Sequence, residues 1–248
     1  MLNIVVPMAG LGSRFLNAGY ETPKPLIPVM GKPMIQVVIN NLKPNRPHRF
    51  IFICQKNHVL EYNLSENLQK WAPDSLFVSV ERVTAGAACS VLLASSWIDN
   101  EDQLMIANSD QYINVDINEY LNTLDENTEL DGLIMTMKAN DPKWSYVGLD
   151  SDNMVNSVIE KKVISNEATV GIYNFRKGAN FVSAAKKMIE NNETTNGEFY
   201  VAPVYNYLLK EKAKVGIYSV GDESEGMYGL GTPADLEFFL LQPVAKEV

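Results

Sequence analysis

Short apolar runs alternate with amphipathic stretches along the first half of the chain. The apolar runs are rich in isoleucine, valine, leucine and phenylalanine, and they predict buried strands at residues 2–6, 49–54, 76–80 and 104–107. Between them, apolar residues recur at helical spacing around residues 34–42, 59–71 and 87–97. Strands that alternate with helices predict an α/β fold, in which a mixed, mostly parallel sheet is flanked by helices on both faces.

The second half of the chain has a less regular pattern. Five shorter runs, some of them alternating polar with apolar residues, predict strands at residues 132–138, 146–149, 155–160, 169–175 and 215–220. Helical periodicity is present at residues 179–191, at about 203–212 and at 234–241, where Pro233 occupies the favoured first turn. No repeat, low-complexity tract or linker divides these segments, so we expect one continuous domain over residues 1–248.

Composition narrows the class of protein. Of the 248 residues, 46% are hydrophobic and 21% are charged, which is typical of a globular chain with a sizeable core. No window approaches 18 uninterrupted apolar residues, and the N-terminus lacks the features of a secretion signal, so we expect no membrane segment. Cys54 and Cys89 lie in apolar runs, which indicates buried free thiols and a cytoplasmic location. The formal net charge of −9, with no basic patch, argues against nucleic acid as a partner.

A glycine-containing loop follows the first predicted strand, and residues 7–15 read Pro-Met-Ala-Gly-Leu-Gly-Ser-Arg-Phe. Gly10 and Gly12 let the backbone approach a ligand closely and direct several N–H groups at one anion, while Arg14 and Lys24 add fixed positive charge. An ordinary strand-to-helix turn is the alternative. The pattern, however, continues through Lys-Pro-Leu-Ile-Pro-Val and Gly-Lys-Pro-Met, which makes it long and specific. We therefore predict a loop that binds the phosphates of a nucleoside triphosphate.

In these segments the chain resembles the sugar-phosphate nucleotidylyltransferases, whose N-terminal signature combines the glycine loop, the arginine and the Lys-Pro pair. The resemblance spans nearly the whole chain and implies a GT-A-like (Rossmann-like) fold, dependence on Mg²⁺ and nucleotide transfer to a phosphorylated small acceptor. It assigns nucleotide binding to about residues 1–115 and acceptor binding to about 116–248. The amino-acid sequence of the loop is most similar to that of the cytidylyltransferases of capsule modification. This similarity implies CTP and L-glutamine phosphate as substrates and CDP-L-glutamine as product. Self-association into a homo-oligomer follows by analogy alone.

Nucleotide transfer to a phosphate monoester needs few chemical groups from the protein. The attacking phosphate is largely ionised at neutral pH, because its second pKa is about 6, and so no general base is required. The protein must hold two anions in line and neutralise the developing charge, which is a task for cations, N–H groups and Mg²⁺. Arg14 and Lys24, with Lys161 added by the resemblance, are the predicted catalytic residues. His48 and His58 are the only histidines, and we expect structural or surface positions for both.

Asp110 is the predicted metal ligand, because it ends a strand where a carboxylate faces the cleft, and Mg²⁺ takes one or two carboxylates. An aspartate that opens a turn is the alternative. Many members of the resembled family carry a second metal-binding aspartate where this chain has Gly229, in the segment Gly-Leu-Gly-Thr-Pro. Either Asp110 acts with phosphates and water alone, or another acid replaces the missing one. The candidates for that replacement are Asp222, Glu225 and Asp235.

Residues 84–88 open a helix with almost no side-chain bulk, so that a flat base can lie against the backbone. In the resembled family a segment of this kind contacts the nucleobase, and Gly86 is the matching position. Close packing between helix and sheet is the alternative reading of this glycine. The predicted nucleotide-binding residues are Met8, Ala9, Gly10, Gly12, Ser13, Arg14, Lys24, Thr84, Gly86 and Ala87.

Acceptor binding is predicted from motifs of the second half. In the resembled family the lysine of a Glu-Lys pair binds the acceptor phosphate, and residues beside a later Gly-Ile-Tyr strand line the acceptor site; Lys161 is the better match and Lys162 the other candidate. Residues 197–198 resemble a Gly-Glu segment of the family whose glutamate binds a sugar hydroxyl, and Glu198 suits a hydroxyl or an amine equally well. The structural alternatives are a solvated strand end for the Glu-Lys pair and an ordinary loop glutamate for Glu198. The predicted acceptor-binding residues are Asn108, Glu160, Lys161, Thr169, Gly171 and Glu198.

Two other classes of protein fit parts of the pattern. A dinucleotide-binding oxidoreductase also uses a strand, a glycine turn and a helix, but its fingerprint needs a third glycine and an acidic residue about 20 residues later. This chain has Phe15 after Arg14 and reads Pro-Val-Met-Gly-Lys at residues 28–32. A nucleotide sensor that releases no pyrophosphate is the second alternative, and Gly229 is its motivation.

Overall fold

A nine-stranded mixed sheet forms the centre of the molecule in a computed structural model that describes residues 1–248. Its strands run in the order β10-β9-β11-β6-β1-β4-β5, with β8 beside β11 and β12 beside β8. Their bounds are β1 (Leu2–Pro7), β4 (His48–Gln55), β5 (Leu76–Val80), β6 (Gln103–Ala107), β8 (Gly132–Lys138), β9 (Ser145–Leu149), β10 (Val155–Glu160), β11 (Glu167–Phe175) and β12 (Val215–Asp222). The strands β6, β1, β4 and β5 are all parallel, whereas β11 is antiparallel to both β6 and β8. The predicted α/β fold class is confirmed.

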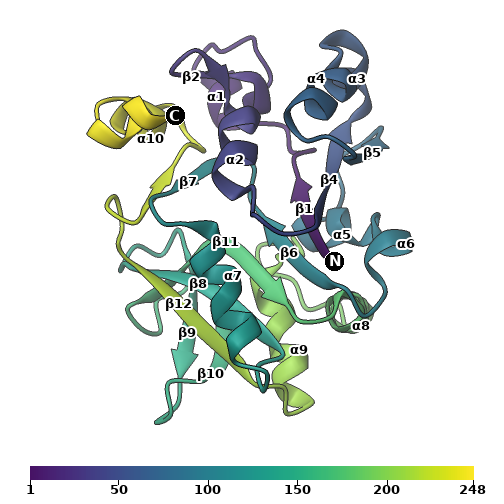
Figure 1. The fold of residues 1–248 in the computed structure, drawn as a ribbon, viewed down its shortest axis with the longest axis vertical. Coiled ribbons are helices and arrows are strands. Elements are labelled where there is room, and N and C mark those ends of the chain that lie inside the picture. The colour runs from purple at the N-terminus through teal and green to yellow at the C-terminus, as the bar shows by residue number, and fades with distance from the viewer.

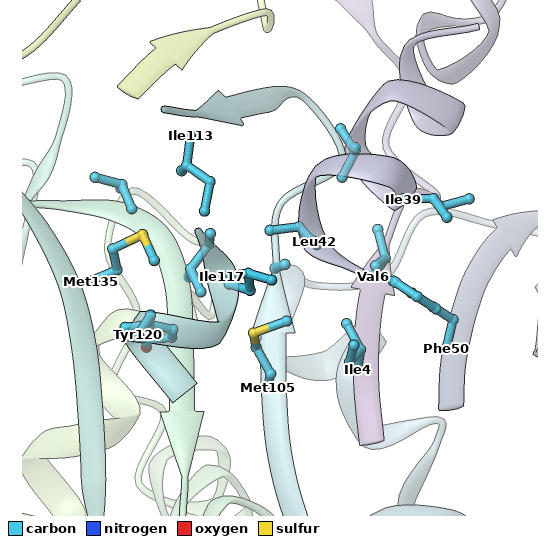
Figure 2. Close-up of a cluster of buried hydrophobic side chains, with 14 of the residues drawn as sticks. Ile4, Val6, Ile39, Leu42, Phe50, Met105, Ile113, Ile117, Tyr120 and Met135 are labelled. Atoms are coloured by element: carbon cyan, nitrogen blue, oxygen red, sulfur yellow. The ribbon is translucent and has the colours of Figure 1, made fainter. Parts of the chain in front are cut away.

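Helices cover both faces of this sheet, because successive residues of the buried strands point to opposite sides. Ile4 and Val6 of β1 belong to one apolar cluster, and Val5 belongs to the other. The first cluster includes residues of, or contacts, α2 (Met34–Leu42), α3 (Lys56–Glu61), α4 (Leu64–Trp71) and α7 (Ile117–Glu126). The second includes residues of α5 (Ala87–Leu92), α6 (Ser95–Ile98), α8 (Gly178–Glu190) and α9 (Tyr205–Lys210). Figure 2 shows the first cluster, where α2 and α7 place apolar side chains against β1 and β6.

A third apolar cluster attaches the C-terminal segment to the N-terminal loops. Leu236 and Phe239 of α10 (Pro233–Leu240) pack with Phe15 of α1 (Ser13–Asn17) and with Val29 of β2 (Pro28–Val29). In Figure 1, α10 lies at the same end of the molecule as α1 and β2. Just before α10, β13 (Met227–Gly229) pairs with β7 (Gln111–Ile113). The remaining elements are η1 (Lys24–Leu26), β3 (Lys32–Pro33), η2 (Ala202–Val204) and η3 (Pro243–Glu247).

Three predicted helices are wrong in extent. The helix predicted over residues 59–71 is two helices, because Asn63 adopts a left-handed conformation with φ of 47° between α3 and α4. The helix predicted over residues 87–97 is α5 and α6, which are joined by tight turns in which Leu93 and Ala94 bond three residues back. Residues 203–212 divide into η2 and α9. The pattern also missed α7, β7 and β13. No helix has the length and apolar character to cross a membrane.

Candidate active site

The glycine loop and the end of β6 lie at one edge of the sheet, because β1 and β6 are parallel neighbours. Hydrogen bonds to β4 hold the loop in place: the Met8 amide donates to the Ile53 carbonyl at 2.9 Å, and Gln55 Nε2 donates to the Ala9 carbonyl at 2.9 Å. Gly12 has a φ of +64°, and a Cβ atom there would come within 3.0 Å of Lys24 Cβ. A glycine is therefore needed where the loop passes close to η1.

Asp110 joins three distant segments at this edge. Its Oδ2 accepts a hydrogen bond from Lys24 Nζ at 2.8 Å, and the two side chains are 25% and 21% exposed. Its backbone carbonyl accepts the Leu230 amide at 2.8 Å. A Cβ atom on Gly231 would lie only 2.7 Å from Oδ2 of Asp110, so the C-terminal segment leaves room for this carboxylate only because residue 231 is a glycine.

A cavity of about 220 Å³, which we call the loop cavity, lies beside the glycine loop. Seven of the predicted nucleotide-binding residues line it: Met8, Ala9, Gly10, Lys24, Thr84, Gly86 and Ala87. Gly12 and Ser13 do not line it, and Arg14 lines the neighbouring cavity instead. Glu198, predicted to bind the acceptor, lines the loop cavity.

Gly86 has a packing role as well as a place in the loop cavity. Its φ is +138°, and a Cβ atom there would lie 2.4 Å from the Phe199 carbonyl oxygen. The two chain segments are tied together, since the Ala88 amide donates to that carbonyl at 3.0 Å and the Phe199 amide donates to the Ala85 carbonyl at 2.9 Å. Close backbone packing is thus sufficient to explain the glycine, and its contact with a base stays a prediction.

A second cavity of about 510 Å³, which we call the edge cavity, adjoins the first, and Ala87 lines both. It brings together residues that the sequence singled out in separate motifs, namely Arg14, Asn108, Asp110, Glu160, Lys161, Thr169 and Gly171. Its lining also includes residues that the sequence analysis did not assign to the site, among them Lys143, Trp144, Ser145, Tyr173 and Tyr200. Lys143 and Trp144 lie just before β9, and only the fold brings them to Lys161.

Lys161 is held in a defined position in the edge cavity. It follows β10 directly and has a φ of 55°, a left-handed conformation that costs a residue with a side chain about 1–2 kcal/mol. Its amide donates to the Trp144 carbonyl at 3.1 Å, and its Nζ donates to the Tyr200 hydroxyl at 2.6 Å. The hydrogen bond to Tyr200 raises the pKa of Lys161 against the opposing effect of burial. The adjacent Lys162 does not line the cavity.

Glu160 is a buried carboxylate, with 9% of its surface exposed. It accepts a hydrogen bond from the Ser145 hydroxyl. Burial raises the pKa of Glu160, the Ser145 hydrogen bond and the charge of Lys161 lower it, and the charge of Glu198 raises it; the net shift is upward. Glu198 therefore lies close enough to act electrostatically on this pair, although it lines the neighbouring cavity. The edge cavity thus offers a fixed cation beside a buried carboxylate, which suits a small anion that carries hydrogen-bond donors.

The two cavities contain neither a histidine nor a metal site made of protein ligands alone. His48 Nδ1 lies 2.8 Å from the Arg46 carbonyl, and neither His48 nor His58 lines either cavity. No three His, Cys, Asp or Glu side chains converge on one point, so a metal at this edge would need oxygen atoms from a ligand. A larger cavity of about 660 Å³, between the end of α7 and the start of β12, contains none of the predicted site residues.

Comparisons with known proteins identify the family of the chain. Residues 4–216 match the family model described as nucleotidyl transferase. The chain is 27% identical over 246 residues to the bifunctional protein GlmU of Desulfotalea psychrophila, and the match covers 95% of this chain and 68% of that protein. In other GlmU proteins that it matches, the chain covers only 39% to 52% of the length.

Solved structures share the fold. The nucleoside-diphosphate-sugar pyrophosphorylase of Vibrio cholerae RC9 has a TM-score of 0.82 at 22% identity, and the match covers 96% of this chain and 100% of that one. The inositol-1-phosphate CTP transferase of T. maritima has a TM-score of 0.73 at 16% identity, with coverage of 99% and 93%. At these identities the likeness concerns the architecture of the chain.

Proposed function

The chain belongs to the nucleotidyl transferase family, and we propose that it transfers a nucleotidyl group from a nucleoside triphosphate to a phosphorylated small molecule. An oxygen of the acceptor phosphate attacks the α-phosphorus, the bond from that phosphorus to the bridging oxygen breaks, and pyrophosphate leaves. One observation carries the proposal: the loop cavity and the edge cavity adjoin at one sheet edge, each with its own fixed cation.

The cations divide between the two anionic substrates. Lys24 borders the glycine loop and Arg14 borders the edge cavity, so together they face the triphosphate from both sides. Lys161 lines the edge cavity beside Glu160 and binds the acceptor phosphate. The donor set at Asp110 suits Mg²⁺, a hard cation that prefers carboxylate and phosphate oxygens. When bound, the metal would neutralise charge on the phosphates, and Asp110 would hold it.

CTP and L-glutamine phosphate are the substrate pair that we propose first, with CDP-L-glutamine as product and capsule modification as the process served. The amino-acid sequence of the glycine loop supports this pair, and a solved protein of the same fold is named as a CTP transferase. The acidic groups beside Lys161 also suit it, because Glu160 and the nearby Glu198 can pair with the ammonium group of an amino-acid phosphate.

A hexose-1-phosphate is the second candidate acceptor, with CTP, UTP or dTTP as the donor. Carboxylates bind sugar hydroxyls as readily as ammonium groups, and the V. cholerae protein of this fold is named for nucleotide-sugar chemistry. The two candidates differ in the charge of the group that meets Glu160.

Pyrophosphate release tests the proposal. Purified protein is incubated with Mg²⁺ and each of CTP, UTP, dTTP, ATP and GTP, against L-glutamine phosphate and a panel of hexose 1-phosphates, and acceptor-free reactions measure background hydrolysis. Acceptor-dependent release with CTP and L-glutamine phosphate supports the first pair, and release with a hexose 1-phosphate alone supports the second. Nucleotide binding without release under every condition would identify a sensor and contradict the proposal.

A further inference from the structure

Two carboxylates flank the segment that contains Gly229 and Gly231. A Cβ atom on Gly231 would lie 2.7 Å from Asp110 Oδ2, and a Cβ atom on Gly229 would lie 3.6 Å from Asp235 Cγ and 3.7 Å from Asp235 Oδ2. Both carboxylates line the edge cavity, as does Arg14. Asp235 therefore occupies the region into which a side chain at position 229 would project.

The start of α10 holds Asp235 in this place. The Asp235 amide donates to Thr232 Oγ1 at 3.1 Å, and the Thr232 hydroxyl donates to Asp235 Oδ2 at 2.7 Å. This cap uses one carboxylate oxygen, and Oδ1 of Asp235 has no hydrogen bond within the protein. Helix capping alone thus leaves half of the carboxylate available to the cavity.

The other two acids that the sequence offered as replacements lie elsewhere. Asp222 is the last residue of β12, and Glu225 lies on the turn that follows; both are exposed, and neither lines the edge cavity. Burial lowers the pKa of Lys143, but its hydrogen bond to Glu223 and the charges of Glu223, Asp141 and, least of all, Asp235 raise it overall. Its ion pairs are with Glu223 at 2.8 Å and Asp141 at 3.7 Å. Asp235 is therefore not required as the counterion of Lys143.

We propose that Asp235 is the second protein carboxylate for the Mg²⁺ that accompanies the nucleotide, and that it acts from α10 in place of a residue at position 229. The inference rests on the proposed function. The donor set fits the metal, since Asp110 and Asp235 provide oxygen ligands and phosphate oxygens complete the shell. Lys24 already places a positive charge 2.8 Å from Asp110 Oδ2, which shows that this edge accommodates a cation.

Calorimetric titration with CTP, with and without Mg²⁺, tests the assignment by binding alone. For Asp235→Asn we expect unchanged affinity for metal-free CTP and about a tenfold loss of the affinity gained from Mg²⁺. Glu237→Gln, an exposed acid on the same helix, is the matched control and is expected to behave as the unchanged protein. Binding of Mn²⁺ to the CTP complex, followed by electron paramagnetic resonance, is expected to weaken in the same variant.

A rescue variant sharpens the test. Gly229→Asp combined with Asp235→Asn returns a carboxylate to the same region and is expected to recover the metal-dependent affinity. If Asp235→Asn does not fold, Asp235→Ser replaces it, because serine retains a hydroxyl near Thr232. A full Mg²⁺ effect in the folded variant would overturn the role of Asp235 and leave the proposed function standing. Failure of the unchanged protein to bind any of the five nucleoside triphosphates would overturn both.

Discussion

The ammonium group of Lys24 lies 2.8 Å from the carboxylate of Asp110, although 86 residues separate the two in the chain. The ion pair links η1, which follows the glycine loop, to the loop that follows β6. Both side chains are about three-quarters buried, so their charges are less screened than those of a surface pair. This relationship places opposite charges at the boundary of two cavities, where phosphate groups and a metal would meet.

Removal of the Asp110 carboxylate should abolish most turnover. In Asp110→Asn we expect kcat/KM to fall on the order of 100-fold or more, because a metal ligand supports several kcal/mol of charge stabilisation. The fold should persist, since the amide can still occupy the space beside Gly231. Pyrophosphate release and thermal unfolding measure the two effects, with Glu101→Gln, an exposed acid before β6, as the control. Full activity in Asp110→Asn would contradict the metal assignment.

Loss of the Arg14 guanidinium should weaken use of the triphosphate. Arg14 is exposed toward the edge cavity and makes no ion pair within the protein, so its removal should leave stability unchanged. Charge-assisted hydrogen bonds contribute about 1.5–3 kcal/mol, and Arg14→Ala should therefore lower kcat/KM for the nucleotide roughly tenfold to 100-fold. Steady-state kinetics with the nucleotide varied provide the measurement, and Lys186→Ala is the control for loss of a surface cation. Unchanged kinetics would argue against the predicted phosphate loop.

The neighbouring lysines 161 and 162 provide a matched pair of variants. Lys161→Ala should raise the KM of the acceptor roughly tenfold to 100-fold, with a smaller effect on the nucleotide, because its ammonium group faces the edge cavity. Lys162→Ala removes an equal charge outside that cavity and should leave both KM values near those of the unchanged protein. A larger effect on the nucleotide than on the acceptor would show that the two anions are assigned to the wrong cavities.

Glu160 should make stability depend on pH. Burial raises its pKa in the folded state above the unfolded value, so the folded protein binds more protons between the two pKa values. The stabilisation that it contributes is complete below the unfolded pKa and is lost as the pH rises through the folded pKa. Glu160→Gln should therefore be more stable than the unchanged protein at pH 7.5, with a smaller difference at pH 4.5, and should bind the acceptor less well. Denaturant unfolding at both pH values, with Glu190→Gln as an exposed control, tests the sign of this effect.

Two glycines of the loop cavity should respond differently to alanine. At Gly86 a Cβ atom would meet the Phe199 backbone at 2.4 Å, so Gly86→Ala should lower the free energy of unfolding by about 2–4 kcal/mol. At Gly10 no atom lies within 4 Å of the Cβ position, so Gly10→Ala should change stability by less than about 0.5 kcal/mol. Its methyl group would occupy the space over the glycine loop and raise the KM of the nucleotide. Equal effects of both substitutions on stability would contradict the geometry.

Much of the fold followed from local patterns. The strands at residues 76–80, 132–138 and 155–160 were predicted with their observed bounds, because apolar residues recur at strand spacing in each. The prediction that residues 76–80 are buried is wrong, since they form the edge strand β5 and none of them is fully buried. The helix breaks at Asn63 and after Leu92 were missed, since apolar periodicity continues through both turns. The short strands β7 and β13 were missed too, because each is stabilised by pairing with the other across more than a hundred residues.

The sequence alone determined the class of fold and the glycine loop with its cations, since periodicity and a contiguous motif are properties of neighbouring residues. Only the tertiary structure decided which distant residues share a cavity: Lys143 and Tyr200 with Lys161, and Asp235 with Asp110. For Asp235 and Asp110 the physical reason is the burial of Phe15 and Phe239 in one apolar cluster, which docks α10 against the N-terminal loops. No spacing along the chain encodes that contact, because it depends on the packing of side chains more than two hundred residues apart.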